Sequence, residues 1–368
     1  MRLQLIGRLI GLPAIASALA LAAWAPVRVG AEEAAAVKAD VRSAAYQDDD
    51  RTFILTSTVA AEASHGPVTV GARYLVDAIS SASVDVTSAA TERFTENRHE
   101  MEGSATLGGA GRTASASYIF STENDWRSHS VSLGGSQDFL QHNVTVAAGY
   151  TGVWNQVSRA GDPYFQRHLD VHAGGLTLTV TPSPVSLVQV NGTLMLARGY
   201  QASPYRYVHV GGAGGTGFAE THPERRTRAA LAARYHRHLF ADTALQTLAR
   251  YYQDDWGVRS LTAGVEWLAG FGELTVGLRA RGYGQTGARF YRERYDQPLR
   301  YMSADRELST FVDLFAGPHL TWVHKRDGTP SEIRVELKAD GFGFWFFDFA
   351  ALPRRYGGVV ELALGVSL

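Results

Sequence analysis

Five charged side chains occur at alternate positions of two segments, on either side of a stretch rich in serine and alanine. They are Arg73, Asp77, Arg98, Glu100 and Glu102. In an extended chain every second side chain points to the same face, so each segment would collect its charges on one side. Opposite charges on two neighbouring strands can pair with each other or together bind a charged ligand. We favour pairing, which would pin the intervening segment 80–96 against the strands.

A second and larger set of charged residues follows the same alternation in the second half of the chain. If these segments are strands, the charges share one face and the aliphatic residues take the other. Seven basic and six acidic groups nearly cancel, so a passage lined by them would be wet and at most mildly selective for anions. The set comprises Arg228, Arg234, Arg250, Arg279, Arg281, Arg334 and Lys338 with Asp254, Glu266, Glu273, Asp313, Glu336 and Asp340.

Other motifs that could bind a metal or a phosphate are incomplete. Asp48–Asp50 lacks the spacing of a calcium loop, and His236 and His238 lack a third ligand. The glycine-rich stretch at 211–217 has no following Lys-Ser/Thr and no strand-helix context. Serine, histidine and aspartate near the expected loops form no recognisable catalytic motif. We therefore expect no metal, no cofactor and no enzymatic activity.

The first 31 residues have the features of an export signal. Arg2 and Arg8 precede an apolar stretch at 9–27, and small residues lead up to Ala31. We expect cleavage after Ala31, which leaves 32–37 as a short periplasmic segment. The alternative is a membrane anchor, because the apolar stretch is nearly long enough to span a bilayer.

The amino-acid composition indicates which classes of partner the chain lacks a surface for. Charged residues make up 19% of the chain and the net charge is -1, so no basic surface for nucleic acid is expected. Cysteine is absent, which excludes disulfides and thiolate chemistry and suits an exported protein.

From about residue 38 onward the apolar and polar positions alternate, which predicts β-strands. At the C-terminus, for example, Val360, Leu362, Leu364 and Val366 alternate with polar or small residues. Seven tight turns alternate with eight loops of variable length, and these connections join sixteen strands. We place them at about 38–47, 52–64, 68–79, 97–108, 113–122, 126–138, 143–155, 165–180, 185–200, 226–239, 243–255, 258–269, 273–286, 306–324, 331–347 and 356–368.

An even number of amphipathic strands, with short turns at one end and long loops at the other, is typical of outer-membrane barrels. Hydrocarbon offers the backbone no hydrogen-bond partner, so a sheet crosses it only if it closes. We therefore predict an all-β fold, an antiparallel transmembrane barrel over 38–368 in the outer membrane of a Gram-negative bacterium. Its last strand would pair with the first near Val41, contact the outer-membrane lipid and be recognised by the assembly machinery.

The tryptophans fit the aromatic belts of such a barrel. Four lie near strand ends on the aliphatic face, and two are out of phase and expected in loops. The four are Trp154, Trp267, Trp322 and Trp345, and the two are Trp126 and Trp256.

Three stretches of the sequence carry a resemblance to a known family. AAYQDDDR precedes YLVDAISSASVDVTSAAT at 74–91, and NRHE follows at 97–100. The chain resembles a family of uncharacterised predicted Gram-negative outer-membrane β-barrels, known only as a domain of unknown function. In that family a strand ends in Asp before a loop rich in Ser, Thr, Gly and Ala, which Asp77, Ser80, Ser83 and Asp85 match. The resemblance implies a barrel in the outer membrane and implies no substrate.

The function we expect is a porin-like channel or facilitator for small polar solutes, because sixteen strands leave room for an aqueous passage. A non-conducting scaffold or surface-binding barrel is the first alternative. A barrel enzyme with a site on the loop side is the second.

Overall fold

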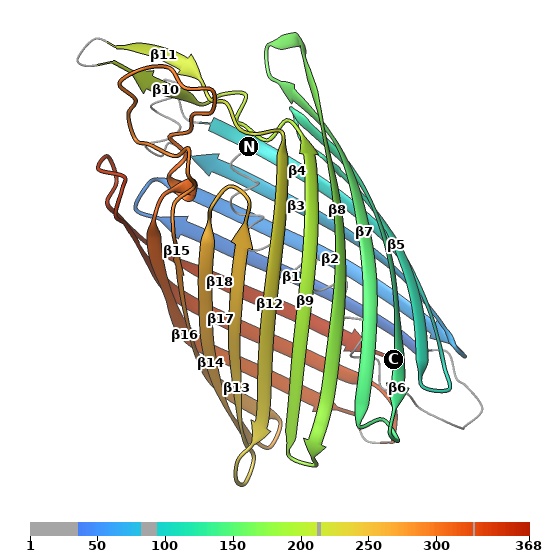
Figure 1. Cartoon of the computed structure of the whole chain (residues 1–368). Helices are drawn as coiled ribbons and strands as arrows, with labels where there is room; N and C mark the ends of the chain where they lie inside the picture. The colour runs from blue at the N-terminus through green and yellow to red at the C-terminus, as the bar shows by residue number, and fades with distance from the viewer. Residues whose placement is uncertain (1–35, 82–93, 212–214, 327) are drawn as a thin grey trace.

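Sixteen strands of the described residues close into one antiparallel barrel in this computed structural model (Figure 1). The structure describes residues 36–81, 94–211, 215–326 and 328–368. Neighbours in the wall are neighbours in the chain, except that β9 pairs with β12 and β1 pairs with β18. The bounds are β1 Ala36–Asp48, β2 Thr52–His65, β3 Val68–Ser81, β4 Phe94–Gly109, β5 Arg112–Thr122, β6 Trp126–Phe139, β7 Val144–Arg159, β8 Asp162–Ser183, β9 Ser186–Gly199, β12 Arg225–His238, β13 Thr243–Asp254, β14 Arg259–Phe271, β15 Leu274–Gln285, β16 Phe311–Lys325, β17 Glu332–Phe346 and β18 Arg354–Ser367.

The first and last strands close the wall. The last strand pairs with the first near Val41, as the sequence predicts, and Val41 lies opposite Leu364. On β18, Leu362 and Leu364 are 45% and 47% exposed on the outer face, whereas Ala363 between them is 7% exposed. The closed register leaves β18 with a partner on each side, so the C-terminal strand is not an edge.

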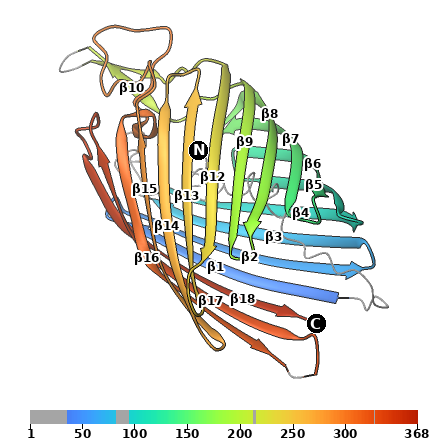
Figure 2. The same cartoon turned by 60° about the horizontal axis from the view of Figure 1, so that its bottom comes forward.

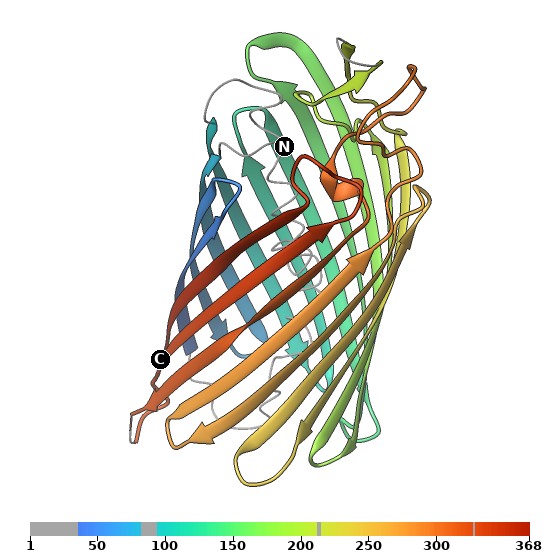
Figure 3. The same cartoon turned by 90° about the vertical axis from the view of Figure 1, so that its left-hand side faces the viewer.

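The two ends of the barrel differ, as expected. Short turns join the strands at the end where β18 finishes, and the longer connections lie at the opposite end (Figures 1 and 2). The strands are tilted, which is clearest for β14 to β18 in Figure 3 and is required to close a sheet into a barrel. Among the described residues no helix is both long and apolar enough to span a membrane.

The prediction of sixteen strands is confirmed, and two loop elements were missed. A small hairpin of β10 (Tyr207–Val210) and β11 (Thr216–Ala219) lies between β9 and β12. A 3-10 turn, η1 (Arg306–Leu308), precedes β16. The expected start of β16 at residue 306 was therefore too early, because Asp305 caps η1 through the backbone N–H of Glu307.

The tryptophans lie where the alternation puts them, with one correction. Trp154, Trp267 and Trp322 are exposed on the outer face, at 43%, 42% and 38%. Trp256 lies in the turn after β13, as expected, but Trp126 is the first residue of β6 and not part of a loop. Its indole Nε1 donates to Asn155 Oδ1 at 3.1 Å, which holds the ring on the inner face.

Candidate functional site in the barrel lumen

The five charged residues of the first half meet on the inner face of β3 and β4. Arg73 donates through Nη2 to Glu100 Oε1 at 2.7 Å and through Nε to Glu102 Oε2 at 2.8 Å. Arg98 Nη2 lies 2.6 Å from Asp77 Oδ2. Every charge of this set therefore has an opposite partner at close range, as our preferred interpretation requires. The part of the loop at 82–93 lies outside the described residues.

The charges of the second half form a ladder of ion pairs on the inner face of β14 to β18. Arg279 donates to both oxygens of Asp340, and Arg281 Nη2 lies 2.7 Å from Asp313 Oδ1. A carboxylate in the middle of the ladder contacts two cationic side chains and a histidine. Glu336 contacts Lys338, Arg334 at 3.1 Å and His319 Nε2 at 3.2 Å, and His319 Nδ1 lies 2.7 Å from Glu266.

On β12 and β13, by contrast, the lumen carries positive charge. Asp254 is paired with Arg226, which is 3% exposed. Arg228 is also on the inner face, opposite Asp254 in the register. Arg234 and Arg250 follow further down, and neither makes an ion pair with a carboxylate of the described residues. The guanidinium of Arg250 lies over the ring of Tyr252, 5.5 Å from its centroid.

Glu273 does not line the lumen, although its parity predicts that it should. It lies in the turn before β15, where alternation no longer fixes direction. Its carboxylate accepts from Trp322 Nε1 at 3.0 Å and lies 2.8 Å from His324 Nδ1. Trp322 is exposed on the outer face, so Glu273 belongs to the outer rim of the short-turn end.

The wall opposite the ladder is polar and mainly uncharged. The inner faces of β5 to β9 present hydroxyl and amide groups that bond to each other across strands. Ser132 Oγ lies 2.9 Å from Thr151 Oγ1, and Asn191 Nδ2 donates to Thr177 Oγ1 at 2.8 Å. Such groups can exchange hydrogen bonds with water or a polar solute at little cost.

At the loop end, one side of the lumen is filled by side chains, which the sequence did not predict. An inner aromatic cluster joins β1 to β3 with β16 and β17, and Arg355 lies 4.2 Å above the ring of Phe344. Arg306 of η1 reaches across to Asp50, with Nη1 and Oδ2 2.7 Å apart. The cluster consists of Tyr46, Ile54, Ile79, Phe311, Phe342, Phe344, Phe346 and Phe349. The alternation of GFGFWFF at 341–347 predicts that three of these rings face inward, but it does not predict which residues they contact.

Two of the long connections are joined into a single unit, the loop cap, made of the described residues of 200–224 and 286–310. Val208 is fully buried against Tyr295 and Met302. Glu220 is completely buried and contacts Ser303 and Arg206, the latter at 3.5 Å, while Arg206 also lies 2.7 Å from Asp305.

Burial alone would raise the pKa of Glu220. The Arg206 guanidinium and the contacts with His222 and Ser303 outweigh that effect and lower its pKa to about 2.

Two carboxylates of the Asp48–Asp50 run are engaged by protein groups. Asp48 accepts from the Tyr46 hydroxyl at 2.7 Å and Asp50 pairs with Arg306, so both carboxylates have protein partners. A group of three carboxylates occurs elsewhere, at Glu96, Glu123 and Asp125. Burial raises the pKa of Glu123 to about 7, which lets the three groups approach each other without full charge.

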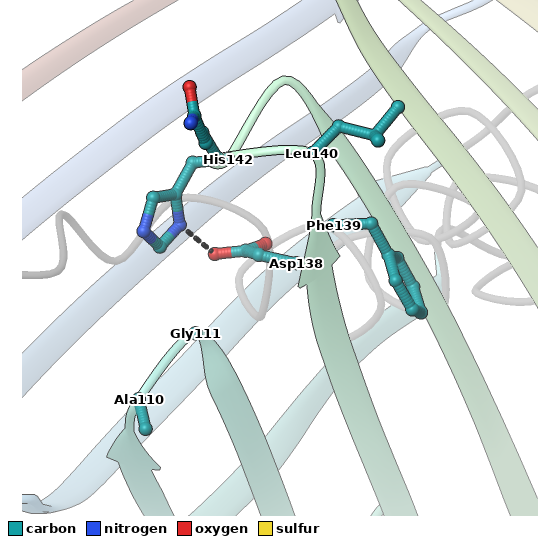
Figure 4. A pocket seen from close by; sticks show the side chains of 7 residues that line it. Ala110, Gly111, Asp138, Phe139, Leu140 and His142 are labelled. Carbon is teal, nitrogen blue, oxygen red and sulfur yellow. Dashed lines mark hydrogen bonds and ion pairs between the residues drawn. The ribbon is translucent and has the colours of Figure 1, made fainter.

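A small hollow lies at the short-turn end, between the turns that follow β4 and β6 (Figure 4). The Asp138 carboxylate accepts from Thr145 at 2.6 Å and lies 2.7 Å from His142 Nδ1. Leu140, Gln141 and His142 all have positive φ, at 49°, 57° and 66°, so these bonds hold a strained turn. The hollow has a structural explanation and is separate from the lumen.

Comparison with known proteins supports the barrel and leaves the function open. Residues 166–336 match the family described as "Protein of unknown function (DUF3570)". The resemblance to an uncharacterised family is thereby confirmed, although the segment at 74–100 that suggested it lies before the matched region. No curated protein matches the chain.

Solved structures with a similar fold are outer-membrane proteins. CdiB from Acinetobacter baumannii has a TM-score of 0.52 at 8% identity, over 90% of this chain and 60% of its own. A bacterial polysaccharide outer membrane secretin has a TM-score of 0.52 at 9% identity, over 91% of this chain and 99% of its own. This chain thus spans 60% of the length of CdiB. At these identities the likeness shows the fold, an outer-membrane β-barrel.

Proposed function

We propose that the barrel is a passive channel for small polar solutes in the outer membrane. The observation that carries the proposal is the division of the lumen into two walls. On β14 to β18 the charges neutralise one another, whereas β5 to β9 present hydroxyl and amide groups that carry no charge. A polar, uncharged wall favours solutes that hydrogen-bond without a fixed charge.

The arrangement of the loop end supports one route through the barrel. The inner aromatic cluster occupies the side of β16, β17 and β1 to β3. The solute path would therefore run along β5 to β9 and pass the arginines of β12 and β13. Because Arg234 and Arg250 have no described carboxylate partner, the passage would prefer anions slightly.

Ion selectivity tests this route. The double variant Arg234→Glu and Arg250→Glu should change a weak anion preference into a cation preference, measured as the reversal potential across a planar bilayer with a salt gradient. Arg112→Glu with Arg237→Glu is the matched control, because both residues lie at the short-turn end on the outer face. An equal shift in both double variants would place the ion path elsewhere.

A scaffold or surface-binding barrel is the second candidate, and the loop cap favours it. Two connections far apart in the sequence are locked together by the buried network around Glu220, and a rigid loop surface suits recognition. Under this alternative the barrel would bind a partner and carry no current. In both cases we propose no catalytic role, export through the N-terminal signal, and recognition of β18 by the assembly machinery.

A further inference from the structure

Two groups of arginines in the barrel have different surroundings. Inner arginines such as Arg73, Arg279 and Arg281 contact carboxylates. A second group is exposed on the outer face at the loop ends of the strands, and within the described residues none of their side chains has a hydrogen bond or an ion pair. This group consists of Arg127, Arg198, Arg225, Arg259 and Arg354.

Several of these arginines gather with histidines on one side of the barrel, on β6 to β12. In the register, Arg127 lies in one row with Gln156 and His168. The next row runs from His129 through Trp154 and Asp170 to Arg198 and Arg225. Among the residues named in these two rows, Asp170 alone is acidic, and it lies opposite Arg198. We name these residues the basic band, which consists of Arg127, His129, His168, Arg198 and Arg225. His172 lies in the next row towards the barrel middle, with Val131 and Leu196.

The basic band lies where the apolar outer surface ends. On β6 the outward residues below His129 are Val131 and Leu133, which are 36% and 55% exposed. On β9 the outward residues below Arg198 are Leu196 and Leu194, at 49% and 52%. Apolar outward positions contact hydrocarbon, so the residues just beyond them lie at the level of the lipid headgroups.

His129 of the band and His172 in the row below it are held by tyrosines in the same way. Tyr118 OH lies 2.7 Å from His129 Nδ1, and Tyr150 OH lies 2.7 Å from His172 Nδ1. When the tyrosine hydroxyl donates to Nδ1, the ring carries its proton on Nε2 and can donate outward. The band therefore offers His129 as a donor in the same row as the guanidinium groups of Arg198 and Arg225, and His172 lies one row below.

We propose that the basic band binds the phosphate groups of outer-leaflet lipids and fixes β6 to β12 at the headgroup level. The guanidinium group is planar and pairs with two phosphate oxygens at once. An arginine near an anionic lipid surface gains about 1 kcal/mol, and the outward arginines have no described protein partner with which a phosphate would compete. The inference rests on the barrel lying in the outer membrane and does not depend on conduction.

Native mass spectrometry of the folded full-length protein in neutral detergent tests the proposal, with bisphosphorylated lipid A as the probe. The variant Arg127→Gln with Arg198→Gln should bind the lipid on the order of 10-fold more weakly or worse. Arg112→Gln with Arg237→Gln removes two outward arginines of the short-turn end and should change the affinity by less than about 2-fold. Arg127→Lys with Arg198→Lys keeps the charge and should retain most of the binding. Heat-modifiable mobility on gels confirms that each variant is folded.

Two further arms identify the ligand. Dephosphorylated lipid A should bind as weakly to the wild type as the intact lipid binds to the glutamine variant, and inorganic phosphate at the same concentration should not compete. Equal affinity of the two double glutamine variants for lipid A would overturn the proposal. Competition by free phosphate or undiminished binding of the dephosphorylated lipid would overturn it too, in favour of a small-anion site or an acyl-chain site. Self-association of the wild type that is lost in the Arg127 and Arg198 variant would overturn it in favour of a protein interface.

Discussion

Asp77 and Arg98 face each other directly across β3 and β4 on the inner face of the barrel, with Oδ2 and Nη2 2.6 Å apart. Asp77 is 4% exposed and also accepts from the Thr56 hydroxyl at 2.5 Å. Removing Arg98 would leave a carboxylate with little access to water. The pair therefore joins β3 to β4 on the inner face of the barrel.

A double-mutant cycle measures this coupling. Asp77→Ala and Arg98→Ala should each destabilise the barrel, and the double variant should be less destabilised than the sum by about 1 to 3 kcal/mol. The measurement is the free energy of unfolding in denaturant. Asp77→Ala combined with Arg73→Ala is the control, since Arg73 pairs with Glu100 and Glu102 instead. Additivity in the Asp77 and Arg98 cycle would disprove the coupling.

Charge on the lipid-facing surface should be costly near the middle of a strand. Leu133 is 55% exposed on the outer face of β6, and its neighbour Ser132 is on the inner face, bonded to Thr151. Leu133→Arg should lower the free energy of unfolding in lipid by about 2 to 4 kcal/mol. Ser132→Arg, at the same depth, should cost much less. Similar costs at both positions would mean that the assigned faces are wrong.

The loop cap should loosen in acid. The pKa of Glu220 falls from its ordinary value of 4.5 to about 2 in the folded protein. A carboxyl group whose pKa is lowered by folding stabilises the folded state at pH values above its ordinary pKa. This contribution is lost as the pH falls through the pKa that the group has in the folded protein. The contribution, at most about 3 kcal/mol, should therefore disappear between about pH 4.5 and pH 2.

Hydrogen exchange of residues 200–211 and 286–310 as a function of pH measures this loosening. Glu220→Gln should show fast exchange at neutral pH and little further change in acid. A wild-type cap whose protection stays constant down to pH 2 would contradict the role of Glu220.

The inner aromatic cluster should contribute strongly to stability. Phe344 is 1% exposed, and Phe344→Ala should cost about 3 to 5 kcal/mol. Phe347, three residues away and 64% exposed, provides the control. Phe347→Ala should stay within about 0.5 kcal/mol of the wild type in the same unfolding experiment. If the two substitutions cost the same, the cluster is not packed as described.

The sequence predicts the strands of the barrel wall better than the side-chain contacts inside the barrel and the elements in its loops. Alternation alone turns Leu364 and Val41 outward and Arg279 and Asp340 inward, because the side-chain period of a strand is fixed at two. Because the alternation of side chains ends where the strand ends, it gives the wrong direction for Glu273, which lies in a turn. It also does not predict that Tyr46 stacks on Phe342, with ring centroids 5.2 Å apart, because that contact requires β1 and β17 to be separated only by β18 in the closed sheet. The strands β10 and β11 have four residues each, too few for a periodic pattern to be recognised.

Single-channel recording of the refolded protein in a planar bilayer shows directly whether the barrel conducts ions. A channel should give discrete current steps that grow with salt concentration, and its weak anion preference should reverse in the Arg234→Glu and Arg250→Glu variant. Heat-modifiable mobility of the same preparation shows that the barrel is folded. A folded and inserted barrel that carries no current at any salt concentration would contradict the channel and leave the surface-binding barrel as the better account.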